Sequence, residues 1–331
     1  MVRIAEDDLI ERIRRRIPSQ TGGALRIGIG HDAAVIRPQG RDWVVTCDQF
    51  LEGVHFLADK HPPDSVGYKA LARATSDVVA MAAQPRFFVL SLALPAKRTG
   101  AWLDAVLSGM ARASRQLGLR LIGGDTARTP NENGRVAFNI TVIGELGRGR
   151  AIGRAGARPG DGIYLTGLLG QAQLGLELLL KTKAGKRPNR KLLAHHFYPA
   201  LPLEFALWLG RNQVPTAMMD VSDGLSTDLT RLCKASGVGA RIYSEQIPAV
   251  AVPTSLQRGR RLHALALVLH GGEDYGLLFT ARRKTASRIP PVFGKTRITR
   301  IGEIVAGSGL KLVDAKGKES ALLPGGWDPF A

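Results

Sequence analysis

Apolar and polar positions alternate along the chain with two different periods. Short apolar runs are typical of strands, and they predict strands over 43–46, 87–94, 119–122, 136–143 and 163–166. Apolar residues three and four positions apart predict helices at 9–17, 70–83, 102–113, 172–180 and 226–235, the last ended by Gly237. Further strands are expected in the run ending at Met219 and near Leu277 and Ile298. This interleaving favours an α/β or α+β fold over an all-α or all-β fold.

The composition of the chain changes after Gly147. The segment that follows is basic and rich in glycine and proline, through Arg154, Gly156 and Pro159. Such a segment marks a domain boundary. We therefore predict two α/β domains, 1–148 and 149–331, each long enough to bury its own core.

The overall composition is that of a globular protein, with 331 residues, 44% of them hydrophobic and 22% charged. The longest apolar stretch, 87–96, is about half of the roughly 20 residues that a membrane span needs. Acidic residues stand near the N-terminus where a signal peptide needs an apolar core. We expect a soluble, cytoplasmic protein without a membrane partner. Cys47 and Cys233 are its only cysteines, which excludes a disulfide framework and a cysteine zinc site.

The net charge of +18 comes from clusters of lysine and arginine at 181–191, 258–261, 282–288 and 295–300. Basic patches can bind nucleic acid through phosphate contacts. These clusters contain almost no aromatic residues, and no helix-turn-helix or zinc-finger spacing accompanies them. We interpret them as a solvated surface and expect no specific nucleic-acid partner. A non-enzymatic polyanion-binding protein remains an alternative.

Several nucleotide-binding and hydrolase motifs are absent: the P-loop, the Gly-x-Ser-x-Gly elbow and the His-Glu-x-x-His helix. Residues 28–33 fit a loose dinucleotide-binding fingerprint, and Asp48 follows twenty residues after Gly28. That fingerprint must open a helix. Residues 34–40 instead predict a short strand and a turn, because Pro38 and Gly40 disfavour a helix. A Rossmann site is therefore not expected.

Aspartates repeatedly follow apolar runs or lie beside glycine-rich turns: Asp32, Asp48, Asp77, Asp125, Asp220 and Asp223. A carboxylate at the end of a strand is held rigidly on the side where ligands collect. Mg²⁺ requires such hard oxygen ligands and shares them with substrate phosphates. The alternative for any single position is an ordinary turn or helix-capping residue.

Two glycine-rich segments also carry carboxylates, Gly123-Gly124-Asp125-Thr126 and Gly271-Gly272-Glu273-Asp274. Glycine lets backbone N–H groups approach phosphate oxygens, while carboxylates bind the bridging metal ions. Each segment alone is also a common turn. Together with the aspartates, they indicate a magnesium- and nucleotide-dependent enzyme that is not of the P-loop type.

In these residues the chain resembles the thiamine-monophosphate kinase family, within the aminoimidazole-ribonucleotide-synthetase-like ATP-binding superfamily. The resemblance runs from residue 28 to residue 330. It rests on ordered motifs: Gly28-Ile29-Gly30-His31-Asp32-Ala33-Ala34, Asp48 followed by Glu52-Gly53-Val54-His55-Phe56, Lys69-Ala70-Leu71-Ala72 leading into Ser76-Asp77, Gly123-Gly124-Asp125-Thr126, Arg154 followed by Gly156-Ala157 and Pro159-Gly160-Asp161, Asp220-Val221-Ser222-Asp223-Gly224-Leu225, Gly271-Gly272-Glu273-Asp274-Tyr275, and Gly326-Trp327-Asp328 followed by Phe330.

The resemblance implies a two-domain fold and a direct transfer of the ATP γ-phosphoryl group to thiamine monophosphate, with no covalent enzyme nucleophile. It implies several Mg²⁺ ions, held by Asp32, Thr46, Cys47, Asp48, Asp77, Asp125, Asp220 and Asp223. It implies ATP contacts from Gly124, Asp125, Arg154 and Ser222, and acceptor contacts from His55, Glu273 and Trp327. It further implies a homodimer formed through the sheet of the N-terminal domain. The C-terminal domain would complete the ATP and acceptor sites.

Two of the implied acceptor residues have structural alternatives: Trp327 as a core or lid tryptophan, and His55 as a structural histidine. The sequence also departs from the family pattern at His31, Cys47, Gly276 and Pro329. A selenophosphate-synthetase-like or aminoimidazole-ribonucleotide-synthetase-like enzyme would share the aspartates and remains the alternative enzyme. The chain lacks the N-terminal Cys/Lys segment of the selenophosphate type and the C-terminal cysteine of the hydrogenase-maturation relatives.

Overall fold

The chain divides into two compact units, which are described separately. Unit 1 comprises residues 1–78 and 83–147, and unit 2 comprises residues 79–82 and 148–331. The computed structural model describes residues 12, 15–17, 25–27, 35–36, 42–147, 151–181, 190–253 and 264–328. The predicted N-terminal helix and the motif at 28–34, with His31 and Asp32, lie largely or wholly outside the described residues.

Unit 1 is built on a four-stranded sheet in the order β3-β6-β4-β5. Its strands are β3 (Trp43–Leu51), β4 (Ala83–Leu94), β5 (Arg120–Arg128) and β6 (Ala137–Leu146). β6 pairs antiparallel with both β3 and β4, whereas β4 and β5 are parallel. Alternate residues of β6 are buried, so one face of the sheet packs on a core. A separate two-stranded sheet joins β1 (Leu25–Ile27) to β2 (Val35–Ile36), so a strand follows the motif at 28–34, as predicted.

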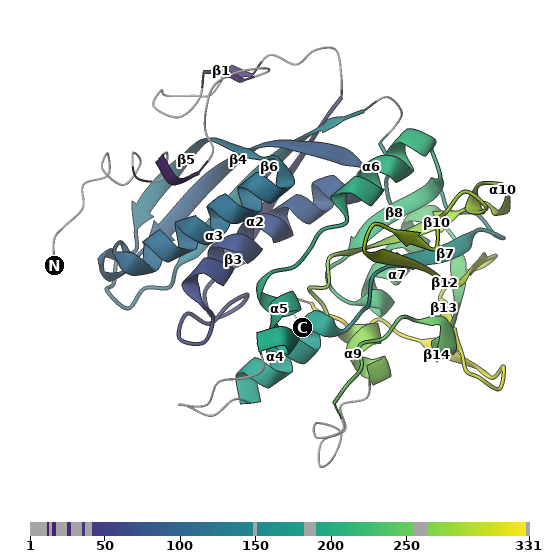
Figure 1. Ribbon diagram of the computed structural model, residues 1–331. Helices are drawn as coiled ribbons and strands as arrows, with labels where there is room; N and C mark the ends of the chain where they lie inside the picture. Colours follow the sequence, from purple (N-terminus) through teal and green to yellow (C-terminus); the bar gives the residue numbers. More distant parts are fainter. Residues whose placement is uncertain are drawn as a thin grey trace. The chain divides into compact units, whose positions relative to one another are not determined.

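Helices α2 (Pro63–Ala80) and α3 (Ala101–Leu117) cover one face of this sheet (Figure 1). A short 3₁₀ turn, η1 (Ala96–Arg98), precedes α3. The two helices cross at glycines: a Cβ at Gly67 would lie 1.9 Å from the Val106 carbonyl oxygen, and one at Gly109 would lie 1.7 Å from that of Asp64. No side chain fits at either position, so the glycines allow the close crossing.

Within the described residues, the predicted strands and helices of unit 1 from residue 43 onward are present, but several bounds were wrong. α2 begins at Pro63 rather than near residue 70, and it ends at Ala80 because Ala82 has a left-handed φ of 57° before β4 begins. β3 and β5 continue through Asp48 and Asp125, which we expected just beyond the strand ends. Pairing with neighbouring strands along their whole length holds these polar residues in the sheet.

Unit 2 contains an eight-stranded sheet in the order β14-β13-β9-β12-β7-β10-β8, with β11 paired to β12. The strands are β7 (Gly162–Thr166), β8 (Pro215–Val221), β9 (Gly239–Tyr243), β10 (Gly276–Ala281), β11 (Val292–Phe293), β12 (Thr296–Val305), β13 (Leu310–Val313) and β14 (Glu319–Leu322). All pairings are antiparallel except β13 with β9. The strands predicted near Leu277 and Ile298 are therefore present as β10 and β12.

The helices of unit 2 are α4 (Gln171–Lys181), α5 (Arg190–Phe197), α6 (Leu203–Asn212), α7 (Leu225–Ser236), α9 (Ala264–His270) and α10 (Arg283–Ala286), with a 3₁₀ turn, η2 (Ser244–Gln246). Leu225, Leu229 and Leu232 of α7 belong to the same buried cluster as apolar side chains of the sheet. α7 ends at Gly237, whose φ of 67° closes the helix, as predicted. None of the helices in the described part of the chain combines the length and apolarity that crossing a membrane requires.

Candidate functional site

In unit 1, the predicted metal ligands Thr46, Asp48 and Asp77 face one another across β3 and α2. The Thr46 hydroxyl donates a hydrogen bond to Asp77 Oδ2 at 2.7 Å. Thr46 and Asp48 are two positions apart on β3, so their side chains lie on the same face of the sheet, the one that α2 covers. Asp48 remains 28% exposed, so its carboxylate can reach a ligand. The three residues supply the hard oxygen donors that Mg²⁺ prefers.

The loop after β3 holds His55. Its Nδ1 accepts a hydrogen bond from the Leu51 N–H at 2.9 Å, and its ring stacks on Phe50. Burial, with Arg73 and Lys69 nearby, lowers the pKa of His55 to about 4. The imidazole is therefore neutral at pH 7, and because Nδ1 accepts, its proton is on Nε2. The Nε2–H of His55 can therefore donate a hydrogen bond to a bound ligand.

Glu52 fixes the start of the same loop. Its carboxylate forms an ion pair of 3.0 Å with Arg98 and accepts the Val136 N–H at 2.9 Å. Gly53 then turns the chain with a φ of 86°. The Glu52-Gly53-Val54-His55 motif thus acts partly as a scaffold: its glutamate and glycine place the histidine.

Asp125 and Gly124 lie at the opposite edge of the sheet from Asp48. Asp48 aligns with Ile140, Leu90 and Gly124 across the strands, whereas Asp125 aligns with Ser91 and Asn139 on the other face. Three strand spacings separate β3 from β5, roughly 14 Å. Mg²⁺ holds its ligands at about 2.1 Å. The two carboxylates, both predicted as ligands of several Mg²⁺ ions, therefore cannot bind one ion within a single chain.

Gly124 lies close to the backbone of β4. A Cβ there would lie 2.0 Å from the Leu90 carbonyl oxygen. Only glycine fits at position 124, so packing requires this residue, which is also exposed to a ligand.

Cys47 projects from β3 on the face opposite Asp48, and its thiol contacts Asn139 Oδ1 at 2.9 Å. That placement leaves its backbone carbonyl, rather than its soft sulfur, as the group on the Thr46–Asp48 segment that suits Mg²⁺.

In unit 2, the end of β8 and the segment after it carry three predicted residues. Asp220 is buried within β8, and Ser222 and Asp223 follow directly. The fully buried Asp228 of α7 accepts the N–H groups of Ser222 and Asp223 at 3.1 and 3.0 Å. Burial, with Asp223 nearby, raises the pKa of Asp228 to about 6. Arg231 pairs with both Asp223 and Asp228.

Sequence reasoning did not identify Asp228, which shapes this loop. Its only signal was an aspartate in the first turn of a predicted helix.

The C-terminal segment packs against the Ser222–Asp223 loop. The Trp327 N–H donates to the Asp223 carbonyl at 2.9 Å, and the Gly326 N–H donates to Thr227 Oγ1 at 3.0 Å. A Cβ at Gly326 would lie 1.8 Å from the Asp223 carbonyl oxygen, so a glycine is required here. The Trp327 side chain is 49% exposed, which excludes the core-tryptophan alternative. The Trp327 backbone is held at the loop, and about half of the residue is accessible to a ligand.

Glu273 lies at the same place. Its N–H donates to the Ser222 carbonyl at 2.8 Å, and its carboxylate lies 3.4 Å from Nδ1 of the buried His196. Glu273 and Tyr275 both have positive φ, 67° and 50°, which costs non-glycine residues on the order of 1–3 kcal/mol. Backbone strain of this kind clusters at functional sites. Ser222, Asp223, Glu273 and Trp327 are therefore brought together.

Gly276, one departure from the family pattern, has a local structural cause. A Cβ there would lie 2.9 Å from the Thr166 carbonyl oxygen and 3.3 Å from its hydroxyl oxygen. The same hydroxyl accepts the Leu277 N–H at 2.8 Å. A side chain at 276 would disturb the pairing of β10 with β7. Pro329 lies outside the described residues.

Arg154 is exposed, and its backbone is held at α7. Its carbonyl accepts the Ser236 hydroxyl at 3.1 Å, and that hydroxyl oxygen also accepts the N–H groups of Gly156 and Ala157 at 3.2 Å. The guanidinium is thereby carried on a fixed turn.

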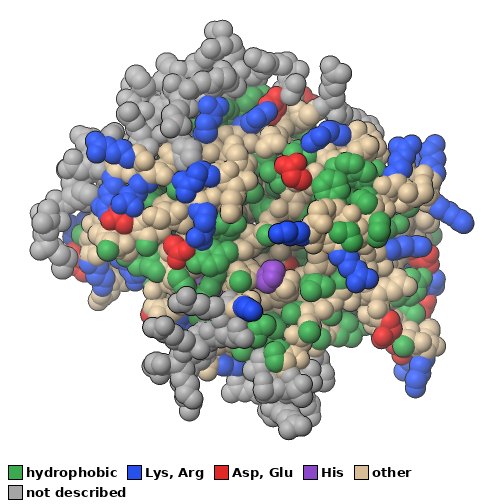
Figure 2. Space-filling model, viewed as in Figure 1, with side chains coloured by type: hydrophobic (Ala, Val, Ile, Leu, Met, Phe, Trp, Pro, Cys, Tyr) green, Lys and Arg blue, Asp and Glu red, His purple; other side chains and the backbone are tan. Residues whose placement is uncertain are grey.

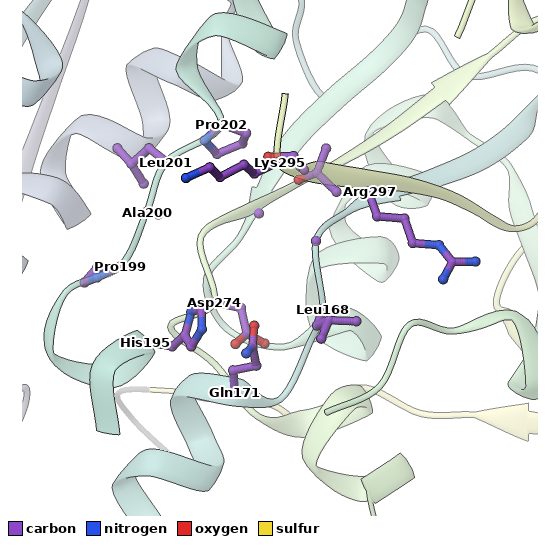
Figure 3. Close-up of a pocket in the computed structure, with 14 residues that line it drawn as sticks. Leu168, Gln171, His195, Pro199, Ala200, Leu201, Pro202, Asp274, Lys295 and Arg297 are labelled. Atoms are coloured by element: carbon purple, nitrogen blue, oxygen red, sulfur yellow. The ribbon is translucent and has the colours of Figure 1, made fainter. Parts of the chain in front are cut away.

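A cavity of about 480 Å³ opens in unit 2 beside the Glu273 segment (Figure 3). Its walls include Leu168, Pro199 and Leu201, with Asp274 and His195 on one side. Asp274 accepts the N–H groups of Gly170 and Ala172 at the start of α4. Burial raises the pKa of Asp274 to about 7. Asp274 thus caps α4, while the adjacent Glu273 belongs to the loop cluster.

The described residues do not contain a complete metal cluster: no three His, Cys, Asp or Glu side chains within them are grouped closely enough to hold an ion. Asp32 lies outside the described residues. The donor chemistry of Thr46, Asp48 and Asp77 fits Mg²⁺, and the phosphates of a nucleotide supply further oxygen ligands.

Comparisons with known proteins place both units in one class. Residues 30–146 match the family described as AIR synthase related protein, N-terminal domain, and residues 158–315 match its C-terminal domain. The chain therefore has the two-domain architecture of the AIR synthase related proteins. It is 31% identical to the thiamine-monophosphate kinase of Aquifex aeolicus, over 99% of this chain and 98% of that protein. The chain belongs to the thiamine-monophosphate kinase family.

Two solved structures are similar over nearly the whole chain. The thiamine-monophosphate kinase from Stenotrophomonas maltophilia K279a is 32% identical, with a TM-score of 0.80, and the match covers 96% of this chain and 98% of that one. The structure of AaThiL complexed with AMPPCP and TMP is 30% identical, with a TM-score of 0.76 and coverage of 100% and 99%. The family, the fold class and the kinase class predicted from the motifs are confirmed.

Proposed function

We propose that this chain transfers the γ-phosphoryl group of ATP to the phosphate of thiamine monophosphate. An acceptor phosphate oxygen forms a bond to the γ-phosphorus, the bond to the β,γ-bridging oxygen breaks, and ADP leaves with that oxygen. The products are thiamine diphosphate and ADP. The similarity to AaThiL complexed with AMPPCP and TMP supports this assignment of substrates.

One observation carries the proposal: the backbone N–H groups of Glu273 and Trp327 bond directly to Ser222 and Asp223, in the loop after β8. Ser222 would contact the nucleotide, and Glu273 and Trp327 would contact the thiamine end. Direct transfer requires donor and acceptor to be held side by side, because positioning and charge stabilisation supply most of the catalysis. The exposed Trp327 ring suits a cationic thiazolium or an aminopyrimidine.

We infer that Thr46, Asp48 and Asp77 hold Mg²⁺, which neutralises phosphate charge when bound. Asp125 and Gly124 would act at a separate position, because the sheet keeps them apart from Asp48. Asp32, the Cys47 carbonyl, Asp220 and Asp223 remain proposed ligands, and Arg154 a proposed ATP contact. The chain's own contribution is to hold the oxygen donors: the Thr46–Asp77 bond joins strand to helix, and Asp228 and Arg231 fix Asp223.

We propose a two-fold homodimer formed through the second face of the unit 1 sheet. Trp43, Phe87, Val89, Ile122 and Ile143 form an apolar cluster on this face. Val45 lies opposite Ile143 in the strand register and is 64% exposed. A second copy would remove this surface from water.

The polyanion-binding alternative has no comparable support. Lys and Arg side chains are spread across the face shown in Figure 2, with Asp and Glu side chains among them. Arg282, Arg283 and Lys284 are exposed on and beside α10. We therefore retain the interpretation of a solvated basic surface.

Consumption of ATP tests the proposed function, with the nucleotide products identified by chromatography and with thiamine monophosphate, free thiamine, selenide and formylglycinamidine ribonucleotide compared as second substrates. Of these four, we expect only thiamine monophosphate to cause consumption of ATP, with ADP as the nucleotide product. Consumption of ATP that depends on either of the last two substrates would instead favour another enzyme of the superfamily.

A further inference from the structure

Helix α2 brings the cation Arg73 to Asp48. Arg73 and Asp77 are four positions apart and therefore share one face of the helix, while Asp48 and Thr46 share one face of β3. Two side-chain contacts therefore join α2 to β3: Asp77 with Thr46 at 2.7 Å, and Arg73 Nε with Asp48 Oδ2 at 3.4 Å. Arg73 is 24% exposed, so its guanidinium reaches the surface of the site.

Arg73 also acts on the histidine at the proposed acceptor end. After burial, the positive charge of Arg73 contributes most to the lowered pKa of His55, and the charge of Lys69 contributes next. The guanidinium thus lies near both Asp48, a proposed metal ligand, and His55, a proposed acceptor contact. No motif of the family resemblance assigns it a role.

The chemistry of the proposed reaction requires a cation at such a place. The acceptor phosphate and the ATP γ-phosphate are both anionic and repel each other. A guanidinium presents donors along two edges, so one arginine can contact a carboxylate and a phosphate at the same time. Its contact with Asp48 is longer than the 2.7–2.9 Å of a strong charge-assisted hydrogen bond.

We propose that Arg73 binds the phosphate of the acceptor and holds it between Asp48 and His55. This inference rests on the proposed function, since it assigns a residue to its acceptor. Arg73 would contact the substrate directly; it forms no covalent bond and transfers no proton. Its role differs from that of an arginine that merely orients Asp48.

The test compares Arg73→Met with Arg73→Lys and a matched control, Arg112→Met. Arg112 lies in the same unit and forms an ion pair of similar length, 3.3 Å, with Asp64 at the start of α2. We expect Arg73→Met to raise the KM for thiamine monophosphate at least tenfold and leave the KM for ATP within twofold. Arg73→Lys should recover part of the loss, because it keeps the charge but not the planar fork. Arg112→Met should change neither constant.

Calorimetry gives a readout that does not depend on turnover. Thiamine monophosphate is titrated into the protein loaded with Mg²⁺ and a non-hydrolysable ATP analogue. The dissociation constant should rise in Arg73→Met by the same factor as KM. An unchanged acceptor KM and dissociation constant, or an equal rise in both KM values, would overturn the proposal. So would an effect confined to the Mg²⁺ concentration needed for half-maximal rate, because that would show that Arg73 acts only through Asp48.

Two further results keep the test decisive. If Arg73→Met does not fold, the test uses Arg73→Lys alone. An unchanged KM for thiamine monophosphate in Arg73→Lys then overturns the proposal. If the wild-type protein releases no ADP with thiamine monophosphate, the proposed function itself fails. An active wild type with unaffected Arg73 variants rejects only the role of Arg73.

Discussion

The Thr46 hydroxyl donates to the Asp77 carboxylate over 2.7 Å and joins strand β3 to helix α2 at the proposed metal site. One turn back along α2, Arg73 pairs with Asp48. Residues four apart on α2 thus contact residues two apart on β3. Hard oxygen donors from separate parts of the sequence therefore lie on one surface.

Replacing Asp48 with Asn removes an anionic ligand while nearly preserving shape. We expect turnover to fall at least tenfold at limiting Mg²⁺ and to recover partly at excess Mg²⁺, with a melting temperature near that of the wild type. Rates measured across a Mg²⁺ titration check this. Asp64→Asn, at the first turn of α2, is the control and should leave the titration unchanged. Wild-type turnover of Asp48→Asn at limiting Mg²⁺ would contradict its role as a ligand.

The homodimer can be disrupted at Val45. A lysine at this exposed position would place a charge on the apolar face of β3, where burial without a partner is unfavourable. We expect Val45→Lys to be monomeric by light scattering at micromolar concentration, while the wild type is a dimer. Val292→Lys, at a similarly exposed valine in unit 2, should remain a dimer. A monomeric wild-type protein would exclude the proposed assembly.

Trp327→Ala should weaken binding of the acceptor alone. Stacking and cation–π contacts contribute on the order of 1–2 kcal/mol when desolvated, so the KM for thiamine monophosphate should rise roughly tenfold. The KM for ATP should stay nearly constant. The melting temperature should change little, because the ring is 49% exposed. A stably folded variant with an unchanged acceptor constant would rule out stacking by Trp327.

His61 should make the protein less stable in acid. Its ring is buried, and burial together with Lys69 lowers its pKa to about 4, from 6.5. Between these values the unfolded chain binds the proton and the folded chain does not, so stability falls as the pH drops from 6.5 to 4. The difference of 2.5 pH units corresponds to about 3 kcal/mol.

His61→Asn keeps an acceptor for the Leu57 N–H without a titrating ring. Urea unfolding at pH 7 and pH 4.5 should show a smaller loss of stability in this variant than in the wild type. Equal losses in both proteins would mean that His61 does not carry the effect.

Much of the fold could be predicted from periodicity, because the spacing of apolar residues in a long amphipathic segment distinguishes a helix from a strand. The helix predicted at 172–180 and the observed α4 differ by one residue at each end. α5 and α6 were missed, because Pro199 and Pro202 break the apolar pattern of that stretch into short pieces. The ends of β3 and β5 were placed too early, because Asp48 and Asp125 are polar residues that pairing retains within strands.

The site was predictable in its residue types and less so in its geometry. Short motifs identified Ser222, Glu273 and Trp327, but their contact depends on backbone bonds between distant segments: Glu273 bonds to Ser222, and Trp327 bonds to Asp223. The separation of Asp48 from Asp125 depends on strand order, which a single sequence does not reveal. Neither Asp228 nor Arg73 belongs to a recognisable sequence motif. Asp228 accepts backbone N–H groups of the Ser222–Asp223 loop, and Arg73 reaches Asp48 through its position on one face of α2.

Chromatographic measurement of thiamine diphosphate is the most direct test of the proposed phosphoryl transfer from ATP to thiamine monophosphate. The purified chain is incubated with ATP, Mg²⁺ and thiamine monophosphate, and product is quantified against ADP in the same samples. We expect thiamine diphosphate and ADP in a one-to-one ratio, with neither formed when free thiamine replaces the monophosphate. ADP formation without thiamine diphosphate, or thiamine diphosphate formed directly from free thiamine, would contradict it.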